Sequence, residues 1–443
     1  MVYGALRTLF RVVLDVFYRR VEVVGLEHVP SRGPLIVTAN HQNALVDPML
    51  LVAALPRRLR PVAKAPLFRH PVIAPFLHAI GAIPVHRRQE SAGTPVRNDE
   101  LFHAAAATLA AGGAILIFPE GVSQPEPVLM PLRTGAARML LAADEVVRAQ
   151  GAADGVTLLA VGLVLHDPGT FRTGRALVVV GPPVATRDLV GRGASDETAV
   201  REITSRLDAA LRDVIVEAEN RETLRLLALL EAIAATDDEP DAAARATWMR
   251  RAMSAYRRLQ TIAADRAARF RAELERYAKD ADLAGVSPTH PGRRYRAGAV
   301  WRFTVREGAA LIGALPLALW GMVVHAVPYH AAGVAARGLR PEPDVEATYK
   351  IIASVLFYPL AWLAEAWLAW RLGGAPLVVF FLLALLPSGF LALTWRERLA
   401  RFATEARAFL RFVFDRDLDA QLAARRAALV AEMRELARLA ESG

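Results

Sequence analysis

A histidine and an aspartate lie close together in the sequence, after a short apolar segment near the start of the chain. Residues 35–38 are Leu-Ile-Val-Thr, His41 follows them, and Asp47 comes six residues later. Imidazole is the side chain best suited to accept a hydroxyl proton near neutral pH, and a carboxylate at its other ring nitrogen would orient it. The two side chains would face different directions on one continuous helix, but they can meet on a loop. The spacing is therefore compatible with a catalytic base and its partner.

Both residues also have a structural interpretation. An aspartate before Pro48 is typical of a helix start, with the carboxylate as N-cap and the proline at the first helical position. A single histidine after a strand is more often structural than catalytic. The pair alone therefore leaves both interpretations open.

Two later segments add polar groups that a phosphorylated substrate could use. Arg87 and Arg88 follow a predicted strand, where their guanidinium groups could hold a phosphate, although the chain is rich in arginine and both could be ordinary surface residues. Glu120 ends another apolar segment, and Gly121 beside it would permit close approach of a substrate. As an alternative, Pro-Glu-Gly is a plain turn.

Alternating strands and helices must position these residues. Short apolar runs bounded by turns predict strands at residues 21–24, 35–38, 62–65, 82–85, 114–118, 158–165 and 176–180. Helical stretches lie between them, about 99–111 and 134–150. This alternation predicts an α/β domain over residues 20–194, with a mixed sheet flanked by helices.

The next region changes in composition. Residues 195–298 are rich in Ala, Arg, Glu and Leu, and predict two long helices, about 196–235 and 241–283. The break at residues 237–240 favours an antiparallel helical hairpin, which could bind a protein partner. An amphipathic helix is expected over residues 1–19, because Leu6, Phe10 and Phe17 recur at helical spacing. It could lie on a membrane or be an ordinary surface helix of the domain.

The membrane is the partner that the composition of the C-terminal half favours. Residues 299–395 contain three apolar segments, 308–328, 351–370 and 372–395, each near the ~20 residues that span a bilayer core. A basic helical tail, residues 396–443, follows them. Three full crossings would place this tail and the α/β domain on opposite sides, which the positive-inside rule disfavours. We therefore expect the first segment to be re-entrant or interfacial.

Bulk composition excludes several classes of protein. The net charge is +9, which could attract nucleic acid or an anionic membrane, and the apolar segments favour the membrane over nucleic acid. The chain has no cysteine, which excludes disulfides, thiolate catalysis and cysteine-based zinc sites. The sequence shows no cluster of metal ligands, P-loop or dinucleotide fingerprint, so no metal or cofactor is expected.

In order and spacing, the motifs resemble those of the PlsC-like glycerolipid acyltransferases, the lysophosphatidate and glycerol-3-phosphate acyltransferases. The matching residues of the first three motifs are Asn40, His41 and Asp47; Gly81, Ile83 and Arg87; and Phe118 to Gly121. A fourth motif, a hydrophobic strand that usually contains Val-Pro, matches poorly because Ala160 stands where proline is expected. The segment from Leu132 to Ala136, with Arg133, resembles the basic segment that commonly follows the third motif.

The first motif departs from the common pattern in its length. Five residues separate His41 from Asp47, where most of the family has four. This form looks like that of the fungal sn-1 glycerol-3-phosphate/dihydroxyacetone-phosphate acyltransferases and their bacterial relatives. Those proteins also resemble the chain in their helical insert and C-terminal membrane segments, which favours glycerol-3-phosphate as acceptor. The resemblance implies an integral protein of the bacterial inner membrane, with the catalytic domain in the cytoplasm.

The resemblance also implies a reaction. An acyl group would pass from a thioester co-substrate, acyl-CoA or acyl-ACP, to a hydroxyl of a glycerophosphate acceptor in phospholipid synthesis. His41 would deprotonate the hydroxyl and Asp47 would orient His41. Arg87, Glu120 and Gly121 would place the acceptor. Further phosphate-binding candidates are Arg88 and Arg133.

Two other functions remain open at this point. One keeps the chemistry and changes the acceptor to lysophosphatidate, another lysolipid or an amino lipid. The other is a catalytically silent membrane adaptor that binds a protein through the helical hairpin. The presence of His41, Asp47, Arg87 and Glu120 argues against a silent domain.

Overall fold

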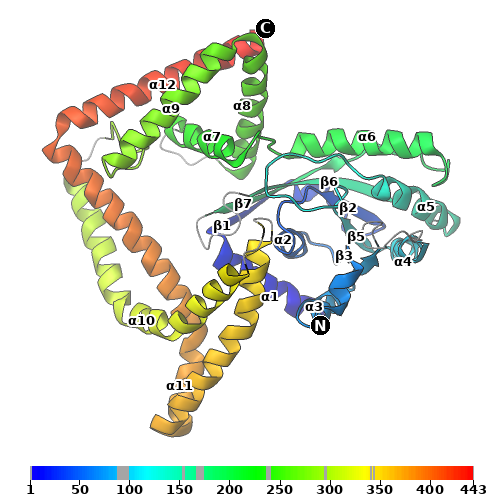
Figure 1. Ribbon diagram of the computed structural model, residues 1–443, viewed down its shortest axis with the longest axis horizontal. Helices are drawn as coiled ribbons and strands as arrows, with labels where there is room; N and C mark the ends of the chain where they lie inside the picture. Colours follow the sequence, from blue (N-terminus) through cyan, green and yellow to red (C-terminus); the bar gives the residue numbers. More distant parts are fainter. Residues whose placement is uncertain are drawn as a thin grey trace. The chain divides into compact units, whose positions relative to one another are not determined.

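The computed structural model describes residues 2–86, 99–151, 155–165, 174–235, 241–293, 297–339, 342 and 345–442 (Figure 1). The chain divides into two compact units. The first combines Met1–Arg221 with Asp241–Arg250 and Glu342–Thr348. The second contains Glu222–Pro240, Arg251–Pro341 and Tyr349–Gly443.

The first unit is built on a single sheet. Its described strands are β1 (Arg20–Val24), β2 (Leu35–Ala39), β3 (Leu59–Lys64), β4 (Ile83–Val85), β5 (Ala114–Ile117), β6 (Thr157–Leu165) and β7 (Arg175–Pro183). They lie in the order β1-β7-β6-β2-β5-β3-β4. Neighbours are parallel except β6 and β7, which are antiparallel. The predicted α/β fold with a mixed sheet is therefore confirmed.

The centre of this sheet is the core of the unit. All five residues of β2 are buried, and so are residues 158–165 of β6. Strands that are apolar on both faces must be covered on both sides. The helices of this unit are α1 (Val2–Phe17), α2 (Val46–Ala54), α3 (Ile73–Ile80), α4 (Asp99–Ala110), α5 (Gly135–Ala149) and α6 (Glu197–Val214), with short 3-10 turns at Leu26–His28 and Ala65–Arg69. The helix α3 was not predicted: it is only eight residues long, and no side chain caps its first turn.

The N-terminal helix α1 packs into the first unit. Its apolar face is buried at Leu6, Phe10, Leu14 and Phe17. On a neighbouring face, Arg7 donates to the carbonyl oxygens of Ala53 and Leu55 at the end of α2. These contacts favour the interpretation of α1 as a helix of the domain, and membrane binding by residues 1–19 stays a prediction.

The helical region contains more breaks than the sequence predicts. The predicted helix 196–235 is two helices, α6 and α7 (Arg221–Ala234), because residues 215–220 are not helical. Buried Ile215 and Val216 and the hydrogen bond from Ala218 N to Pro127 O outweigh the local helix preference. The predicted helix 241–283 is likewise divided into α8 (Ala242–Ile262) and α9 (Ala264–Leu283), with Ala263 non-helical between them.

The last helix covers α9. Leu436 and Ala440 of α12 (Arg416–Ser442) form a core cluster with Leu259 and Ala267. Arg266 also pairs with Glu432 at 2.6 Å. The predicted basic tail is therefore partly a packed helix of the second unit.

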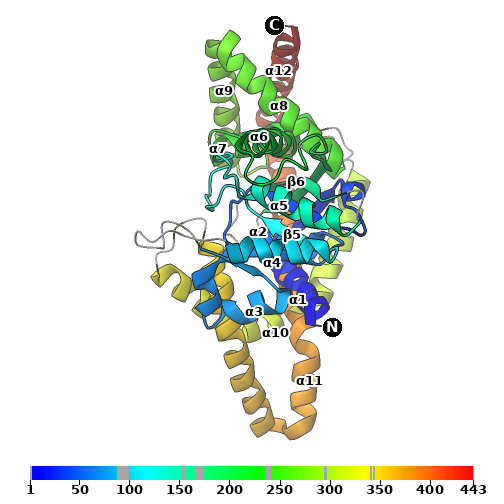
Figure 2. The ribbon, with the colours of Figure 1, turned by 90° about the vertical axis from the view of Figure 1, so that its right-hand side faces the viewer.

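Two long helices contain the apolar segments. In the described residues, Val300–Gly338 of α10 (Ala297–Gly338) and the whole of α11 (Glu346–Phe414) are long and apolar enough to cross a membrane. The helix α11 includes both of the last two predicted segments and is interrupted at Gly374, whose φ of 65° and ψ of −157° are not helical. Figure 2 shows its two arms running side by side from this turn. Phe381 and Leu385 of the second arm pack with Ala369 of the first.

Candidate functional site

The candidate site lies at the carboxyl ends of two adjacent parallel strands. β2 and β5 pair in register, with Thr38 opposite Ile117. The chain leaves β2 at Asn40 and His41, and leaves β5 at Phe118, followed by Glu120. Parallel pairing therefore places the first and third motifs together, because the carboxyl ends of parallel strands meet at one edge of a sheet.

Asn40 fixes the backbone just before the histidine. Its side-chain Nδ2 donates to Leu163 O at 2.9 Å, and its Oδ1 accepts from Leu163 N at 2.7 Å. Leu163 belongs to β6, the other neighbour of β2. The buried amide thus replaces the next pair of ladder hydrogen bonds where β2 has ended, and it sets the direction in which His41 leaves the sheet.

His41 and Asp47 form a close pair. His41 Nδ1 lies 2.9 Å from Asp47 Oδ2, the histidine side chain is 14% exposed and the aspartate is fully buried. A carboxylate can only accept a hydrogen bond, so Nδ1 carries the proton and Nε2 has a free lone pair. In the described part of the protein, Nε2 has no hydrogen-bond partner. The pair has the geometry that a general base requires.

The loop between the two residues closes around the carboxylate. Asp47 Oδ2 also accepts hydrogen bonds from the backbone amides of Gln42 and Asn43, each at 2.7 Å. Asp47 lies in the first turn of α2, after the N-cap residue Leu45, and its side chain makes no cap of that helix. The structure therefore does not support the N-cap interpretation, and the longer spacing between His41 and Asp47 does not prevent their contact.

Phe118 covers one face of the histidine ring. The two ring centroids are 4.0 Å apart and the planes are inclined by 15°. The backbone oxygen of His41 also accepts from Gln124 N at 3.0 Å. The ring contact restricts the imidazole, and the hydrogen bond restricts the backbone of His41. The sequence analysis gave neither Phe118 nor Gln124 a role, although Phe118 stands in the third motif.

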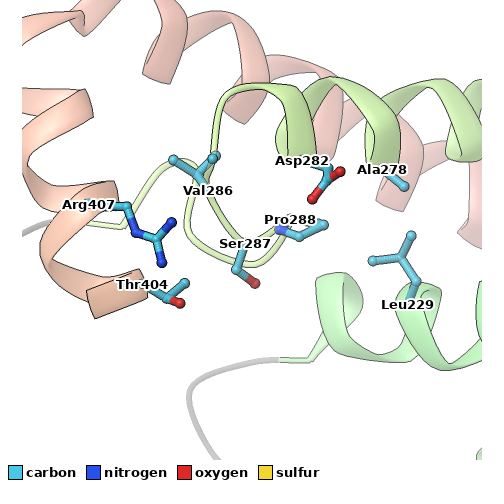
Figure 3. Close-up of a pocket in the computed structure, with 9 residues that line it drawn as sticks. Leu229, Ala278, Asp282, Val286, Ser287, Pro288, Thr404 and Arg407 are labelled. Atoms are coloured by element: carbon cyan, nitrogen blue, oxygen red, sulfur yellow. The ribbon is translucent and has the colours of Figure 1, made fainter. Parts of the chain in front are cut away.

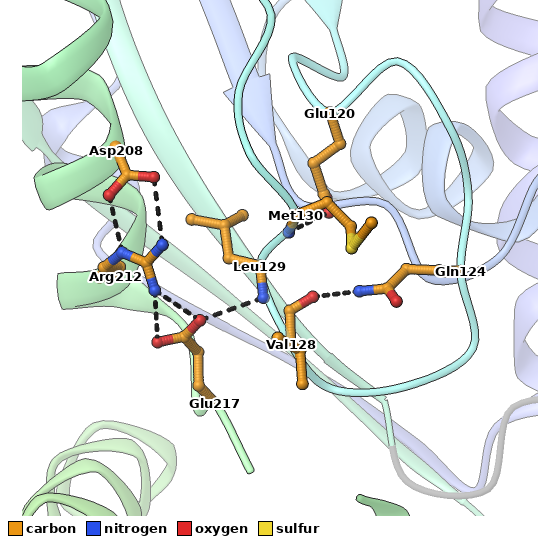
Figure 4. A network of polar contacts seen from close by, with 8 residues as sticks. All are labelled: Glu120, Gln124, Val128, Leu129, Met130, Asp208, Arg212 and Glu217. Atoms are coloured by element: carbon orange, nitrogen blue, oxygen red, sulfur yellow. Dashed lines mark hydrogen bonds and ion pairs between the residues drawn. The ribbon is translucent and has the colours of Figure 1, made fainter. Parts of the chain in front are cut away.

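Glu120 binds the protein backbone with both carboxylate oxygens. Its Oε1 accepts from His41 N at 2.7 Å and its Oε2 accepts from Met130 N at 2.8 Å (Figure 4). Burial raises the pKa of Glu120 to about 6, although these two amide hydrogen bonds favour the ionised form. Glu120 therefore connects the histidine to residues 121–133, the loop that follows β5, and its predicted role in placing the acceptor would act through this loop.

Gly121 and Arg133 lie together beside Glu120. Gly121 has a φ of 75°, a conformation that L side chains rarely adopt, and an added Cβ would lie 3.3 Å from Arg133 Cγ. Arg133 N donates to Pro119 O at 2.7 Å, and the residue is exposed. The structure thus brings this predicted phosphate-binding candidate next to the third motif. The other two arginine candidates, Arg87 and Arg88, lie outside the described residues.

The second unit contains a separate hollow. A cavity of about 570 Å³ lies between α9, the loop after it and α11. Figure 3 shows residues that line it, among them Asp282, Ser287, Thr404 and Arg407. Thr404 Oγ1 and Arg407 Nε each donate to the backbone of their own helix. None of the predicted site residues lines this cavity. The described residues also contain no group of His, Asp and Glu that could hold a metal ion.

Comparison with known proteins finds a similarity within the α/β domain. Residues 20–163 match the family described as Acyltransferase. An uncharacterized acyltransferase of Schizosaccharomyces pombe is 24% identical, over 51% of this chain and 46% of its own length. The chain thus spans less than half the length of this relative.

A solved structure was also matched, the 1-acyl-sn-glycerophosphate acyltransferase PlsC of Thermotoga maritima. It is 19% identical, with a TM-score of 0.35, over 48% of this chain and 78% of that protein. This likeness is too low to support an argument about function. The family match covers β1 to β6, the strand ends that carry His41 and Glu120, and all three motifs. Over residues 20–163, this chain is therefore similar to the acyltransferase family, and these residues include the candidate site.

Proposed function

We propose that this protein is a membrane-bound O-acyltransferase that transfers a fatty acyl group from acyl-CoA or acyl-ACP to a hydroxyl of glycerol-3-phosphate. The observation that supports this most is the contact of His41 Nδ1 with the buried Asp47, which leaves Nε2 available at the edge of the sheet. An acceptor hydroxyl that gives its proton to Nε2 becomes a nucleophile. Asp47 stabilises the imidazolium that forms.

The remaining steps follow from the chemistry of a thioester. The acceptor oxygen forms a bond to the carbonyl carbon, the carbon–sulfur bond breaks, and His41 returns the proton to the leaving thiolate. No acyl-enzyme is required, which agrees with a chain that has no cysteine. The exposed Arg133, beside the third motif, is a candidate for the phosphate of the acceptor, and Arg87 and Arg88 remain candidates from the sequence.

An acyl-transfer assay on purified membranes tests this proposal. Glycerol-3-phosphate, dihydroxyacetone phosphate and lysophosphatidate would each be offered with acyl-CoA and with acyl-ACP. We expect turnover of glycerol-3-phosphate, and a loss of about 10²- to 10⁴-fold in rate for His41→Ala, because the general base is removed. His78→Ala is the matched control, since His78 is exposed on α3 and its ring forms a hydrogen bond within that helix, to Ala74 O.

Each other outcome of this assay has a definite meaning. Turnover of lysophosphatidate alone would replace the proposed acceptor and keep the chemistry. Near-wild-type rates in His41→Ala would refute the mechanism. Turnover of none of the acceptors, with the wild-type protein folded, would refute the proposed activity.

We further propose that α10 and α11 hold the protein in a bilayer. Many large apolar side chains of both helices are exposed, among them Val323, Leu363, Trp367 and Leu383. Arg371 stacks on Trp367 close to the turn at Gly374. Aromatic and arginine side chains of this kind favour the boundary between lipid and water.

The contacts within the second unit support a re-entrant α10. Leu311 O accepts from Trp395 Nε1 at 2.8 Å, and His325 Nε2 lies 3.1 Å from Leu385 O. α10 is therefore antiparallel to the second arm of α11. His325 contacts α11 at Leu385, ten residues before Trp395, which is about 15 Å along the helix and roughly half the thickness of a bilayer core.

In this proposal, the turn of α11 sets the side of the bilayer on which α10 ends. Because the arms of α11 form a hairpin, Lys350 at the start of the first arm is on the same side of the bilayer as Trp395. α10 enters beside Trp395 and must return to that side before Lys350. Figures 1 and 2 show α10 bent, with both ends farther than its middle from the α11 turn, and Pro328 lies inside it. This topology supports the positive-inside argument and places the basic residues after Trp395 on one side with both ends of α10.

A further inference from the structure

A loop of the first unit is hydrogen-bonded to the histidine site. Residues 121–133 follow β5, and Gln124 N of this loop bonds His41 O at 3.0 Å. Met130 N donates to Glu120 Oε2 at 2.8 Å, and Arg133 N closes the loop on Pro119 O at 2.7 Å. Pro119 and Glu120 of the third motif thus hold the loop at Met130 and Arg133.

A second glutamate, Glu217, holds the same loop at Leu129. Glu217 Oε1 accepts from Leu129 N at 3.1 Å, so two consecutive amides, of Leu129 and Met130, bind Glu217 and Glu120 (Figure 4). Glu217 is largely buried, and Arg212 Nη1 contacts both of its carboxylate oxygens at 2.8 and 2.9 Å. A buried carboxylate is costly unless it is paired and hydrogen-bonded, and this one is both.

The residues after Glu217 continue the contact along the loop. Ala218 N donates to Pro127 O at 2.9 Å, and Arg221 N donates to Glu126 Oε2 at 3.2 Å. The Arg221 guanidinium also bonds Pro125 O. Residues 217–221 therefore lie along residues 125–129, and they belong to no part of the acyltransferase family match, which ends at residue 163.

We propose that Glu217 is a positioning residue of the acyltransferase site, one that acts through the loop 121–133 and so extends the site beyond the family match. This inference rests on the proposed function. If Leu129 loses its partner, the peptide next to Met130 is free to move, and the carboxylate of Glu120 that binds His41 N loses its fixed support. A displacement of about 1 Å at a catalytic group can cost on the order of 10²-fold in rate.

Three substitutions separate the effect of the length of the Glu217 side chain from the effect of its charge. Glu217→Gln keeps an oxygen at the same distance for Leu129 N and loses the charge that faces Arg212. Glu217→Asp keeps the charge and is one methylene shorter. Glu217→Ala removes both functions. Glu202→Ala is the control, because Glu202 pairs with Arg206 at 2.9 Å on the exposed face of the same helix, α6.

Two measurements read out the effect on the full-length, detergent-solubilised protein. The first is hydrogen exchange of peptides from residues 121–133, which needs no substrate. The second is the split of the acyl-transfer rate into kcat and KM, normalised to the folded fraction. We expect faster exchange in this loop and a fall of about 10- to 100-fold in kcat for Glu217→Ala, with a smaller loss for Glu217→Gln than for Glu217→Asp.

A merely structural role gives a different pattern. If Glu217 only stabilises α6 through Arg212, the aspartate variant retains at least as much activity as the glutamine variant, and exchange in the loop is unchanged. Either result overturns the proposal, as does a Glu217→Ala protein with the kcat of Glu202→Ala. If Glu217→Ala does not fold, the order of the glutamine and aspartate variants still decides.

Failure of the proposed function can be told apart from failure of this inference. The wild-type protein could transfer no acyl group while the loop exchanges faster in Glu217→Ala and Glu217→Asp. This result would contradict the proposed function and would still support the role of Glu217 in holding the loop. If the wild-type protein is active, and activity and exchange are unaffected in all three variants, the proposed function stands and the role of Glu217 is contradicted.

Discussion

The carboxylate of Asp47 gathers three hydrogen bonds on one oxygen, from His41 Nδ1 and from the amides of Gln42 and Asn43. These bonds fold the loop back on itself, which is how a partner six residues away reaches the imidazole. At this scale the chemistry depends on which ring nitrogen carries the proton. An ionised carboxylate favours protonation at Nδ1 and leaves the Nε2 lone pair free for the proposed role as base.

Substitution of Asp47 by asparagine tests this dependence. The amide group of asparagine can donate to Nδ1, which favours the tautomer with the proton on Nε2, where it cannot act as base. We expect a fall in kcat of up to about 10⁴-fold for Asp47→Asn. Steady-state kinetics measure the effect, and circular dichroism checks that the fold persists. A variant with unchanged kcat would show that Asp47 has only a structural role.

The pKa of Glu120 predicts a pH dependence of stability. Burial raises this pKa from 4.5 to about 6, so between these values the folded state binds a proton that the unfolded state has lost. The protonation of Glu120 therefore contributes about 2 kcal/mol to the free energy of unfolding. This contribution is fully present below about pH 4.5 and is lost as the pH rises through 6.

Thermal unfolding at several pH values measures this contribution. The difference in Tm between wild type and Glu120→Gln should change between pH 6.5 and 4.5 in favour of the wild type, since glutamine does not titrate. The slope is the readout, because the substitution also alters the bonds to His41 and Met130. Parallel curves for the two proteins would contradict the raised pKa.

At the scale of secondary-structure elements, the close approach of β6 and α6 positions residues 215–221. A Cβ added to Gly162 of β6 would lie 2.1 Å from Val214 O at the end of α6. This position requires glycine because of space, not because of its backbone angles. The end of α6 can therefore approach the sheet closely enough for Glu217 to reach the loop at Leu129.

Gly162→Ala should accordingly destabilise the first unit. Overpacking in a dense core typically costs about 1–3 kcal/mol, because neighbouring backbone must move. Gly135→Ala is the control, since an added Cβ there meets no atom within 4 Å at the start of α5. Chemical denaturation would show a lower midpoint for Gly162→Ala only. Equal midpoints would mean that α6 can shift at no cost.

Sequence patterns anticipated elements whose causes are local and missed those set by distant contacts. The strands and the His41–Asp47 pair follow from short apolar runs and from residues near each other in the chain. The break between α6 and α7 does not, because Ala218 is held by Pro127. The same holds for the partners of Glu120, the amides of His41 and Met130, although the motif pointed to Glu120 itself. It also holds for Glu217, which no motif contains.

At the scale of the whole molecule, the proposed topology places both ends of α10 on one side of the bilayer. The chain has no native cysteine, so single introduced cysteines can be labelled without background. Leu372 lies at the turn of α11, Leu339 follows α10, and Ser442 ends α12; the first two are well exposed.

Labelling of sealed vesicles with an impermeant maleimide tests the topology. Leu339→Cys and Ser442→Cys should react from the same side, and Leu372→Cys from the opposite side. Reaction of Leu339→Cys and Ser442→Cys from opposite sides would mean that α10 crosses the bilayer completely. Reaction of all three from one side would mean that the hairpin of α11 does not cross.

The order of the strands has a consequence for anyone who wishes to express the α/β domain alone. β7 lies between β1 and β6, although it begins at residue 175, after the family match has ended. A fragment that stops at residue 163 would leave β1 without β7, its neighbour among the described strands, and expose a long unpaired edge on β6. The shortest fragment that preserves the sheet, α6 and the contact of Glu217 would have to continue to about Arg221, where the first compact segment of the chain ends.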